Sequence, residues 1–235
     1  MTSSGIPWGS CSISHDFFAH VGRCYEMGVQ EQAGQARARA GLNGSCDVGV
    51  AAYPVAVAAW DALLSEVFLS PTSGAGRGSD LASIPVEEVH SWPVLDRTFR
   101  LPKLALGTTF AKGHQPYQDL RDLVAVRNSL VHFSFDSEPR AASEIRRLSK
   151  RGIFLAVPRS RASDYAWPAK VSCTEGIRWT INTLAAAARE IERMADGSSL
   201  NHVSLCANFQ PLSLEEARAI FLKYDVDPEK HIPER

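Results

Sequence analysis

Hydrophobic residues recur along most of this chain at the three- and four-residue spacing of amphipathic α-helices. This pattern predicts helices at 14–41, 47–70, 119–133, 139–151 and 174–194. Alternation typical of strands is scarce, and only 153–157 has an extended character. The chain therefore has the pattern of an all-α fold, a bundle of four to five main helices.

The predicted helix at 119–133, DLRDLVAVRNSLVHF, carries a charge inside its apolar stripe. On a helical wheel of about 100° per residue, five apolar side chains share one side: Leu120, Leu123, Val124, Leu130 and Val131. Arg127 falls in the middle of that stripe, and a buried guanidinium without a partner costs several kcal/mol. Asn128 and His132 are four residues apart and so are neighbours on one flank. We expect arginine, amide and imidazole to meet at one edge of this helix.

An acidic partner for Arg127 is available on the most apolar segment, 47–70. Asp61 and Glu66 interrupt its hydrophobic run. Either both acids face solvent, or one of them pairs with Arg127. The sequence leaves the two interpretations open.

The remaining segments suggest how the domain is organised. Residues 1–13 are predicted to be a flexible N-terminus, 14–196 the helical domain, and 197–235 a C-terminal tail with one short helix. Within the domain, 71–100 is predicted to be a long loop insertion, with a short helix at 86–90 and a further helical turn within 101–110. Ser213 and Glu216 have the spacing of a capping box that would start the tail helix.

Four other residues mark expected helix ends. Pro116 suits the first turn of the helix that carries Arg127. Ser137 is a candidate N-cap and Gly152 a candidate C-terminal stop for the next helix. Thr174 is the candidate N-cap of the last long helix.

Charge is uneven, although the chain of 235 residues has a formal net charge of -1. The span 140–161 contains seven basic residues against one acidic residue, Glu144, a net of +6 that the rest of the chain offsets with -7. Clustered basic residues can bind phosphates. Four of them are candidate RNA-binding residues: Arg146, Arg147, Lys150 and Arg151. A solvated helix face with a loop explains the same charge, and both interpretations remain.

Cysteine usage and terminal sequence bear on location. The five cysteines are scattered without a CxxC pair, which is typical of reduced thiols in a cytoplasmic protein. The N-terminus lacks the pattern of a secretory signal, and no run of about 18 apolar residues predicts a membrane span.

No metal-ligand spacing, P-loop or nucleophile elbow is present in the sequence, so we expect neither metal nor cofactor.

Arginine with histidine is suited to cleaving RNA through its own 2′-hydroxyl. Arg127 can stabilise charge on a phosphate, and the His132 imidazole can transfer a proton near neutral pH. Asn128 can orient either group. Acid and base must both be supplied, and a two-fold dimer would place two such sets across one cleft.

The segment RNSLVH, Arg127 to His132, resembles the R-N-x-x-x-H form of the signature of the HEPN family. The apolar frame DLVAVRNSLVHF and the preceding Ala-rich helix ending WDALLSEVF are also similar to that family. The resemblance spans roughly 14–196. It implies an all-α fold that dimerises through the motif helices. It also implies a metal-independent endoribonuclease with catalytic Arg127 and His132, accompanied by Asn128.

For many members this resemblance also implies a toxin of a toxin–antitoxin or phage-defence system, with an antitoxin protein as a partner. One branch carries a tyrosine two residues after the histidine, which a nucleotidyltransferase antitoxin modifies. Here that position is Ser134, so this regulation is not expected. Other members are non-catalytic modules that bind RNA, nucleotide or a partner protein, and this is the alternative function.

Overall fold

The structure is a computed structural model that describes residues 12–37, 47–70, 80–132, 138–154, 171–196 and 202–230, with 198, 200 and 232. The regular secondary structure of those residues is helical, without a strand, which confirms the all-α class. Of the segment expected to be extended, Ile153 and Phe154 form bends, and 155–157 lie outside the described residues. So do the predicted flexible residues 1–11, Ser137 and Gly197.

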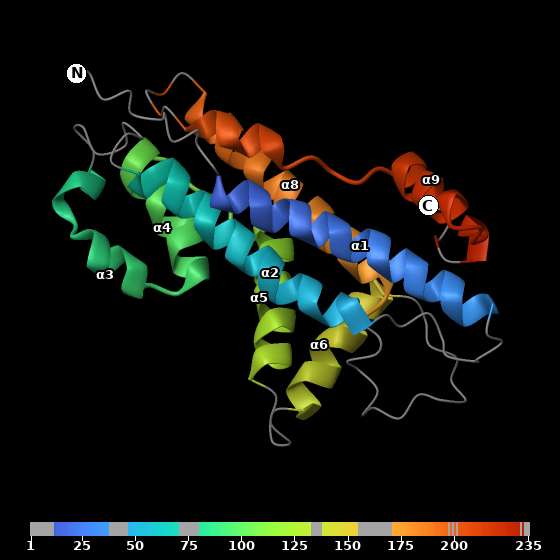
Figure 1. Cartoon of the computed structure of the whole chain (residues 1–235). Coiled ribbons are helices and arrows are strands. Elements are labelled where there is room, and N and C mark those ends of the chain that lie inside the picture. Colours follow the sequence, from blue (N-terminus) through green and yellow to red (C-terminus); the bar gives the residue numbers. More distant parts are fainter. Residues whose placement is uncertain are drawn as a thin grey trace, which may run out of the picture.

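Three long helices form the body of the molecule. Helices α1 (Ile13–Arg37) and α2 (Asp47–Leu64) run antiparallel side by side, and α8 (Thr174–Ala195) lies behind them (Figure 1). Each coincides with a helix predicted from periodicity. The N-cap of α8 is Cys173, one residue before the predicted Thr174.

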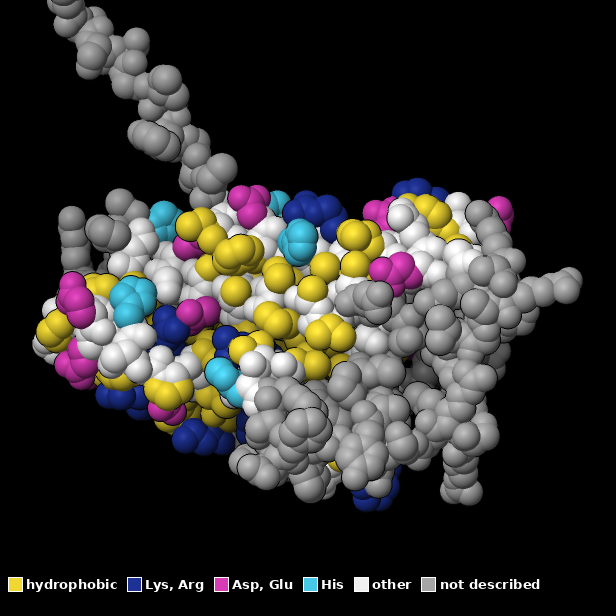
Figure 2. Space-filling model, turned by 60° about the horizontal axis from the view of Figure 1, so that its bottom comes forward, with side chains coloured by type: hydrophobic (Ala, Val, Ile, Leu, Met, Phe, Trp, Pro, Cys, Tyr) yellow, Lys and Arg dark blue, Asp and Glu magenta, His cyan; other side chains and the backbone are white. Residues whose placement is uncertain are grey.

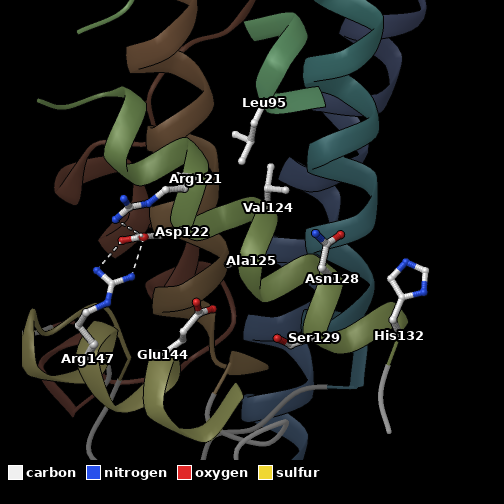
Figure 3. A pocket seen from close by; sticks show the side chains of 10 residues that line it. All are labelled: Leu95, Arg121, Asp122, Val124, Ala125, Asn128, Ser129, His132, Glu144 and Arg147. Atoms are coloured by element: carbon white, nitrogen blue, oxygen red, sulfur yellow. Dashed lines mark hydrogen bonds and ion pairs between the residues drawn. The ribbon is translucent and has the colours of Figure 1, made fainter. Parts of the chain in front are cut away.

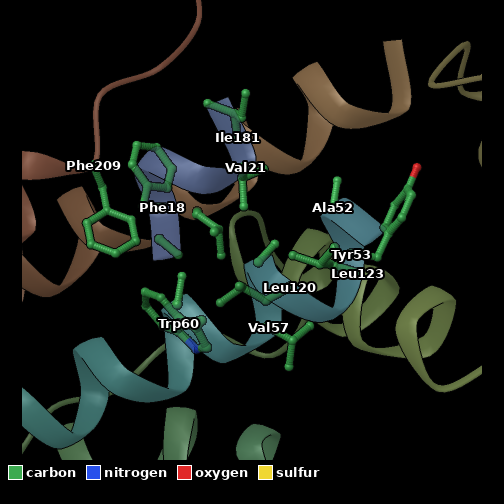
Figure 4. Packing of buried hydrophobic residues seen from close by; sticks show 14 of the residues in the cluster. Phe18, Val21, Ala52, Tyr53, Val57, Trp60, Leu120, Leu123, Ile181 and Phe209 are labelled. Atoms are coloured by element: carbon green, nitrogen blue, oxygen red, sulfur yellow. The ribbon is translucent and has the colours of Figure 1, made fainter. Parts of the chain in front are cut away.

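Helix α2 is the centre of the bundle, and a π-helical turn at Ser65–Leu69 continues it. Pro54 lies inside this helix. Its buried side chains include Tyr53, Trp60 and Leu63, which pack with α1, α5 and α8 (Figure 4). By length and composition the helical segment Val48–Leu69 could cross a membrane. Half of its apolar 18-residue stretch is, however, buried inside the fold. Burial on several sides explains why the segment is apolar nearly all round.

The part of the predicted loop insertion at 71–100 that the structure describes is largely helical. The short helix predicted at 86–90 is present as α3 (Val86–Ser91). A 3₁₀ turn at Asp80–Ser83 and the 13-residue α4 (Val94–Leu106) correct the prediction of a loop, and α4 includes part of the turn predicted within 101–110. Helix α4 buries two polar side chains. Trp60 Nε1 donates to Thr98 Oγ1 over 2.8 Å, and Arg97 pairs with Asp61 over 2.5 Å. The face of α4 that meets α2 therefore includes polar side chains.

Glycines let α2 and the start of α8 approach closely. A Cβ on Gly49 would lie 2.6 Å from the backbone oxygen of Ser172. A Cβ on Gly176 would lie 2.3 Å from the hydroxyl oxygen of Tyr53, which itself donates to the Val171 carbonyl over 2.7 Å. Neither position has room for a larger residue.

The C-terminal tail packs along α1. A 3₁₀ turn at Val203–Asn208 leads to α9 (Leu214–Lys223), whose start has the predicted capping box of Ser213 and Glu216. Phe209 stacks on Phe18 with ring centroids 4.5 Å apart, and Phe221 meets Tyr25 edge-on at 6.4 Å. These rings bury one side of α1 under the tail.

Helices α5 (Tyr117–Val131) and α6 (Glu138–Lys150) project from the body (Figure 1). Pro116 is the N-cap of α5, and His132 is its C-cap, donating its backbone N–H to the Asn128 carbonyl over 2.9 Å. Gly152 has φ 71°, a left-handed conformation that suits glycine after the end of α6. This pair of helices carries the candidate site.

Candidate functional site

A cavity of about 600 Å³ lies between α4, α5 and α6. Ten residues line it: Leu95, Arg121, Asp122, Val124, Ala125, Asn128, Ser129, His132, Glu144 and Arg147 (Figure 3). Most of these belong to α5, at positions one turn apart. The cavity therefore follows the flank of α5 on which the sequence predicted Asn128 and His132, from the buried Asp122 to the exposed His132.

The structure brings Asn128 and His132 together at the outer end of this cavity. Both side chains are exposed and project to the same side of the last turns of α5 (Figure 3). An imidazole in this position is accessible to a ligand in the cavity. Neither side chain has an ion pair within the described chain.

Arg127 lies next to the cavity and does not line it. Its Nη1 donates to the amide oxygen of Asn128 over 2.9 Å. Its Nε is buried and lacks a hydrogen-bond partner in the structure as described. The bond from Arg127 occupies the amide oxygen, so the Asn128 NH₂ group remains as the donor available to a ligand.

Of the two interpretations left open for Asp61 and Glu66, the pairing of one of them with Arg127 is wrong. Asp61 pairs with Arg97 of α4. Glu66 accepts hydrogen bonds from the hydroxyls of Ser12 and Ser14, at 2.9 and 2.6 Å. The second acid therefore holds the start of α1 against the end of α2.

The buried charge of α5 is Asp122, whose side chain is only 2% exposed. Arg147 of α6 donates to both of its carboxylate oxygens, at 2.6 and 3.0 Å. Arg151 donates to Asp122 over 3.0 Å and to Asp119 over 2.6 Å. The hydrogen bond to Asp122 raises the pKa of Arg147 above its ordinary value. These bonds fix α6 against α5 and set the position of one cavity wall.

This arrangement corrects half of the predicted RNA-binding set. Arg147 and Arg151 are neutralised by Asp119 and Asp122, so they do not form a free phosphate-binding surface. Arg146 and Lys150 are exposed on α6 and remain candidates. The α5–α6 charge pairing left a signal in the sequence, because acids three residues apart on one helix match bases four apart on the next.

Glu144 is one of the polar cavity residues, with Arg121, Asp122 and Ser129, to which the sequence assigned no function. It projects from α6 opposite Val124 and Ala125 (Figure 3). Its sequence context, one acid among basic residues, was the available signal. Across the described ranges, no group of three or more His, Cys, Asp or Glu side chains could hold a metal ion.

No family model, curated protein or solved structure matches this chain.

Proposed function

We propose that this protein is a metal-independent endoribonuclease of the HEPN type that acts as a cytoplasmic homodimer. The observation that carries the proposal is the cluster of Arg127, Asn128 and His132 on the last turns of α5. The imidazole and the amide are exposed at the mouth of a cavity, and the guanidinium orients the amide. This cluster has the residues that the RNSLVH resemblance implies, and its geometry leaves the imidazole and the amide accessible.

The proposed reaction needs one base and one acid. The 2′-hydroxyl loses its proton to one His132 imidazole as its oxygen attacks the adjacent phosphorus. The bond from phosphorus to the 5′-oxygen breaks, and the leaving oxygen takes a proton from a second imidazole. The Asn128 NH₂ group and the Arg127 guanidinium would stabilise the charge on the phosphate oxygens. The products are a 2′,3′-cyclic phosphate and a 5′-hydroxyl.

A second copy of the chain would supply the second imidazole. Hydrophobic side chains gather across the middle of one face of the molecule (Figure 2). Large exposed apolar side chains include Ile13, Phe17 and Met27 of α1 and Val131 of α5, the residue before His132. Exposed apolar surface, which includes Val131 next to His132, favours association of two copies. We propose a role as a toxin in a toxin–antitoxin or phage-defence system, with an antitoxin protein as a further partner.

The test is cleavage of single-stranded RNA by purified protein in EDTA. We expect 2′,3′-cyclic phosphate ends from the wild type and none from His132→Ala. His90→Ala is the matched control, because His90 is exposed on α3, away from the cavity. Equal cleavage by the His132→Ala variant would refute the proposal.

The alternative is a non-catalytic module of the same fold that binds RNA, nucleotide or a partner protein. The pairing of Arg147 and Arg151 with acids of α5 favours this alternative, because it neutralises positive charge that would otherwise attract an RNA substrate. Under this alternative Arg127 is structural. Arg127→Ala would then lower the melting temperature, while His132→Ala would change neither stability nor any RNA-directed activity.

A further inference from the structure

The proposed catalysis uses only the outer end of the cavity. The inner part has an apolar wall formed by Leu95 of α4 with Val124 and Ala125 of α5. Its volume lies within the roughly 300–1,000 Å³ range of small-molecule sites. An apolar wall with polar groups around it suits a flat ring that has polar edges.

Glu144 supplies an unused acceptor in this inner part. In the part of the chain that the structure describes, no residue forms an ion pair or hydrogen bond with its side chain. Its charge contributes to raising the pKa of Arg147, but that guanidinium directs both terminal nitrogens to Asp122. A carboxylate accepts hydrogen bonds and does not donate them. A ligand that pairs with Glu144 must therefore present N–H or O–H donors.

Two other side chains supply donors along the cavity. At its outer end Asn128 presents its NH₂ group to the phosphate, because Arg127 occupies its oxygen. Arg121 is half exposed and lies 3.7 Å from Asp122, too far for a hydrogen bond, so its guanidinium retains donors for a ligand. The cavity thus combines a carboxylate acceptor with donors from α5.

The four RNA bases differ in how they match this set. Guanine has two adjacent donors, N1–H and the N2 amino group, which can pair with both oxygens of one carboxylate. Its O6 and N7 are acceptors on the neighbouring edge. Uracil has one N–H between two carbonyls, and adenine and cytosine each place an amino group beside a ring nitrogen that accepts. These three would leave a carboxylate oxygen facing an acceptor.

We propose that this cavity binds a guanine base next to the scissile phosphate of the RNA. Glu144 accepts from N1–H and N2–H, Arg121 donates to the acceptor edge, and the apolar wall covers the ring, while the Asn128 NH₂ group contacts the adjoining phosphate. This specificity rests on the ribonuclease activity proposed above. Reading an unpaired base on its Watson–Crick edge is the usual route to sequence preference on single-stranded RNA.

Nucleotide binding tests the site without any cleavage. The four nucleoside 3′-monophosphates are titrated into the wild type by calorimetry or NMR. We expect guanosine 3′-monophosphate to bind about ten- to a hundredfold more tightly than the others. Glu144→Gln should remove that preference, and Glu87→Gln, an exposed acid on α3, should retain it. Thermal melts of both variants check folding. Equal binding of all four nucleotides, binding of none, or an unchanged preference in Glu144→Gln would overturn the proposal.

Mapping of RNA cleavage sites separates this inference from the nuclease proposal. Cleavage next to guanine by the wild type, with relaxed preference in Glu144→Gln, supports both. Cleavage without base preference overturns the guanine site and leaves the nuclease intact. Selective binding of guanosine 3′-monophosphate without any RNA cleavage supports the guanine site and refutes the nuclease.

Discussion

Arg147 donates two hydrogen bonds to Asp122, so that a guanidinium of α6 closes over a carboxylate buried in α5. The carboxylate is 2% exposed and the guanidinium is 46% exposed. The pair therefore links the two helices at the boundary between core and solvent. It lies at the inner end of the cavity whose outer end carries His132.

Removing this carboxylate should destabilise the fold. Asp122→Ala leaves Arg147 and Arg151 without their shared partner. Because both arginines are partly exposed, we expect a loss of about 1–3 kcal/mol, less than for a fully buried pair. Urea unfolding measures it. Asp96→Ala is the control, since Asp96 is exposed on α4 and should change stability by less than about 0.5 kcal/mol. Equal stabilities of the two variants would contradict the structural role of Asp122.

The proposed nuclease makes Asn128 a direct contact to phosphate. Asn128→Ala should lower the RNA cleavage rate by about 10²-fold, because a preorganised donor is lost. Its side chain is exposed, so the melting temperature should stay near that of the wild type. Asn208→Ala provides an exposed asparagine on the tail for comparison. An undiminished rate in Asn128→Ala would exclude this contact.

Tight contact between α2 and α8 makes Gly49 intolerant of a side chain. Gly49→Ala would place a Cβ 2.6 Å from the Ser172 backbone, and we expect a loss of about 1–3 kcal/mol from the forced shift. Gly22→Ala on α1 meets nothing within 4 Å. It should stabilise by about 0.5–1 kcal/mol through helix propensity. Chemical unfolding of the two variants should move in opposite directions, and a shift in the same direction would argue against this packing.

The Cys206 thiol should resist alkylation in the folded protein. Burial, with a smaller contribution from Glu192, raises its pKa to about 12. An unfolded thiol ionises near 8.5, so at about pH 8 the reactive thiolate should be roughly a thousandfold rarer in the folded state. Iodoacetamide labelling followed by peptide mass spectrometry, with and without denaturant, measures the protection. Rapid labelling of the native protein would contradict it.

The same pKa shift predicts how stability depends on pH. The folded thiol keeps its proton between about pH 8.5 and 12, where the unfolded thiol loses it. The Cys206 contribution is therefore complete below this window and is lost as the pH rises through it. Cys206→Ala should show a shallower decline of unfolding free energy above about pH 8.5. A decline identical to that of the wild type would show that the thiol does not contribute.

Periodicity predicted the long helices well because each buries an apolar stripe against its neighbours. The capping box at Ser213 was predictable for a local reason, since its two hydrogen bonds join residues three apart. Helix α4 was missed because the side chains that it buries include Arg97 and Thr98. Their partners, Asp61 and Trp60, lie on another helix, and a pattern within one segment cannot show such pairs.

The position of Arg127 shows a second limit of the helical wheel. Leu120 and Val131 lie on the same side of α5, yet Leu120 is 1% exposed and Val131 is 47% exposed. Burial depends on how far along the helix a residue lies as well as on its angle, because α5 extends beyond the body. Arg127 is near the outer end and is half-buried, whereas Asp122, off the stripe but deeper in the bundle, is buried. The flank shared by Asn128 and His132 was predictable from angle alone.

The packing of the tail on α1 has a practical consequence for shortened versions of the chain. A protein ending near residue 196 keeps every helix of the α5–α6 site. It would, however, leave the aromatic faces of Phe18 and Tyr25 in contact with water. Such a protein should be prone to aggregation during expression. An affinity tag added behind the tail should disturb the packing of the tail on α1 less than truncation would.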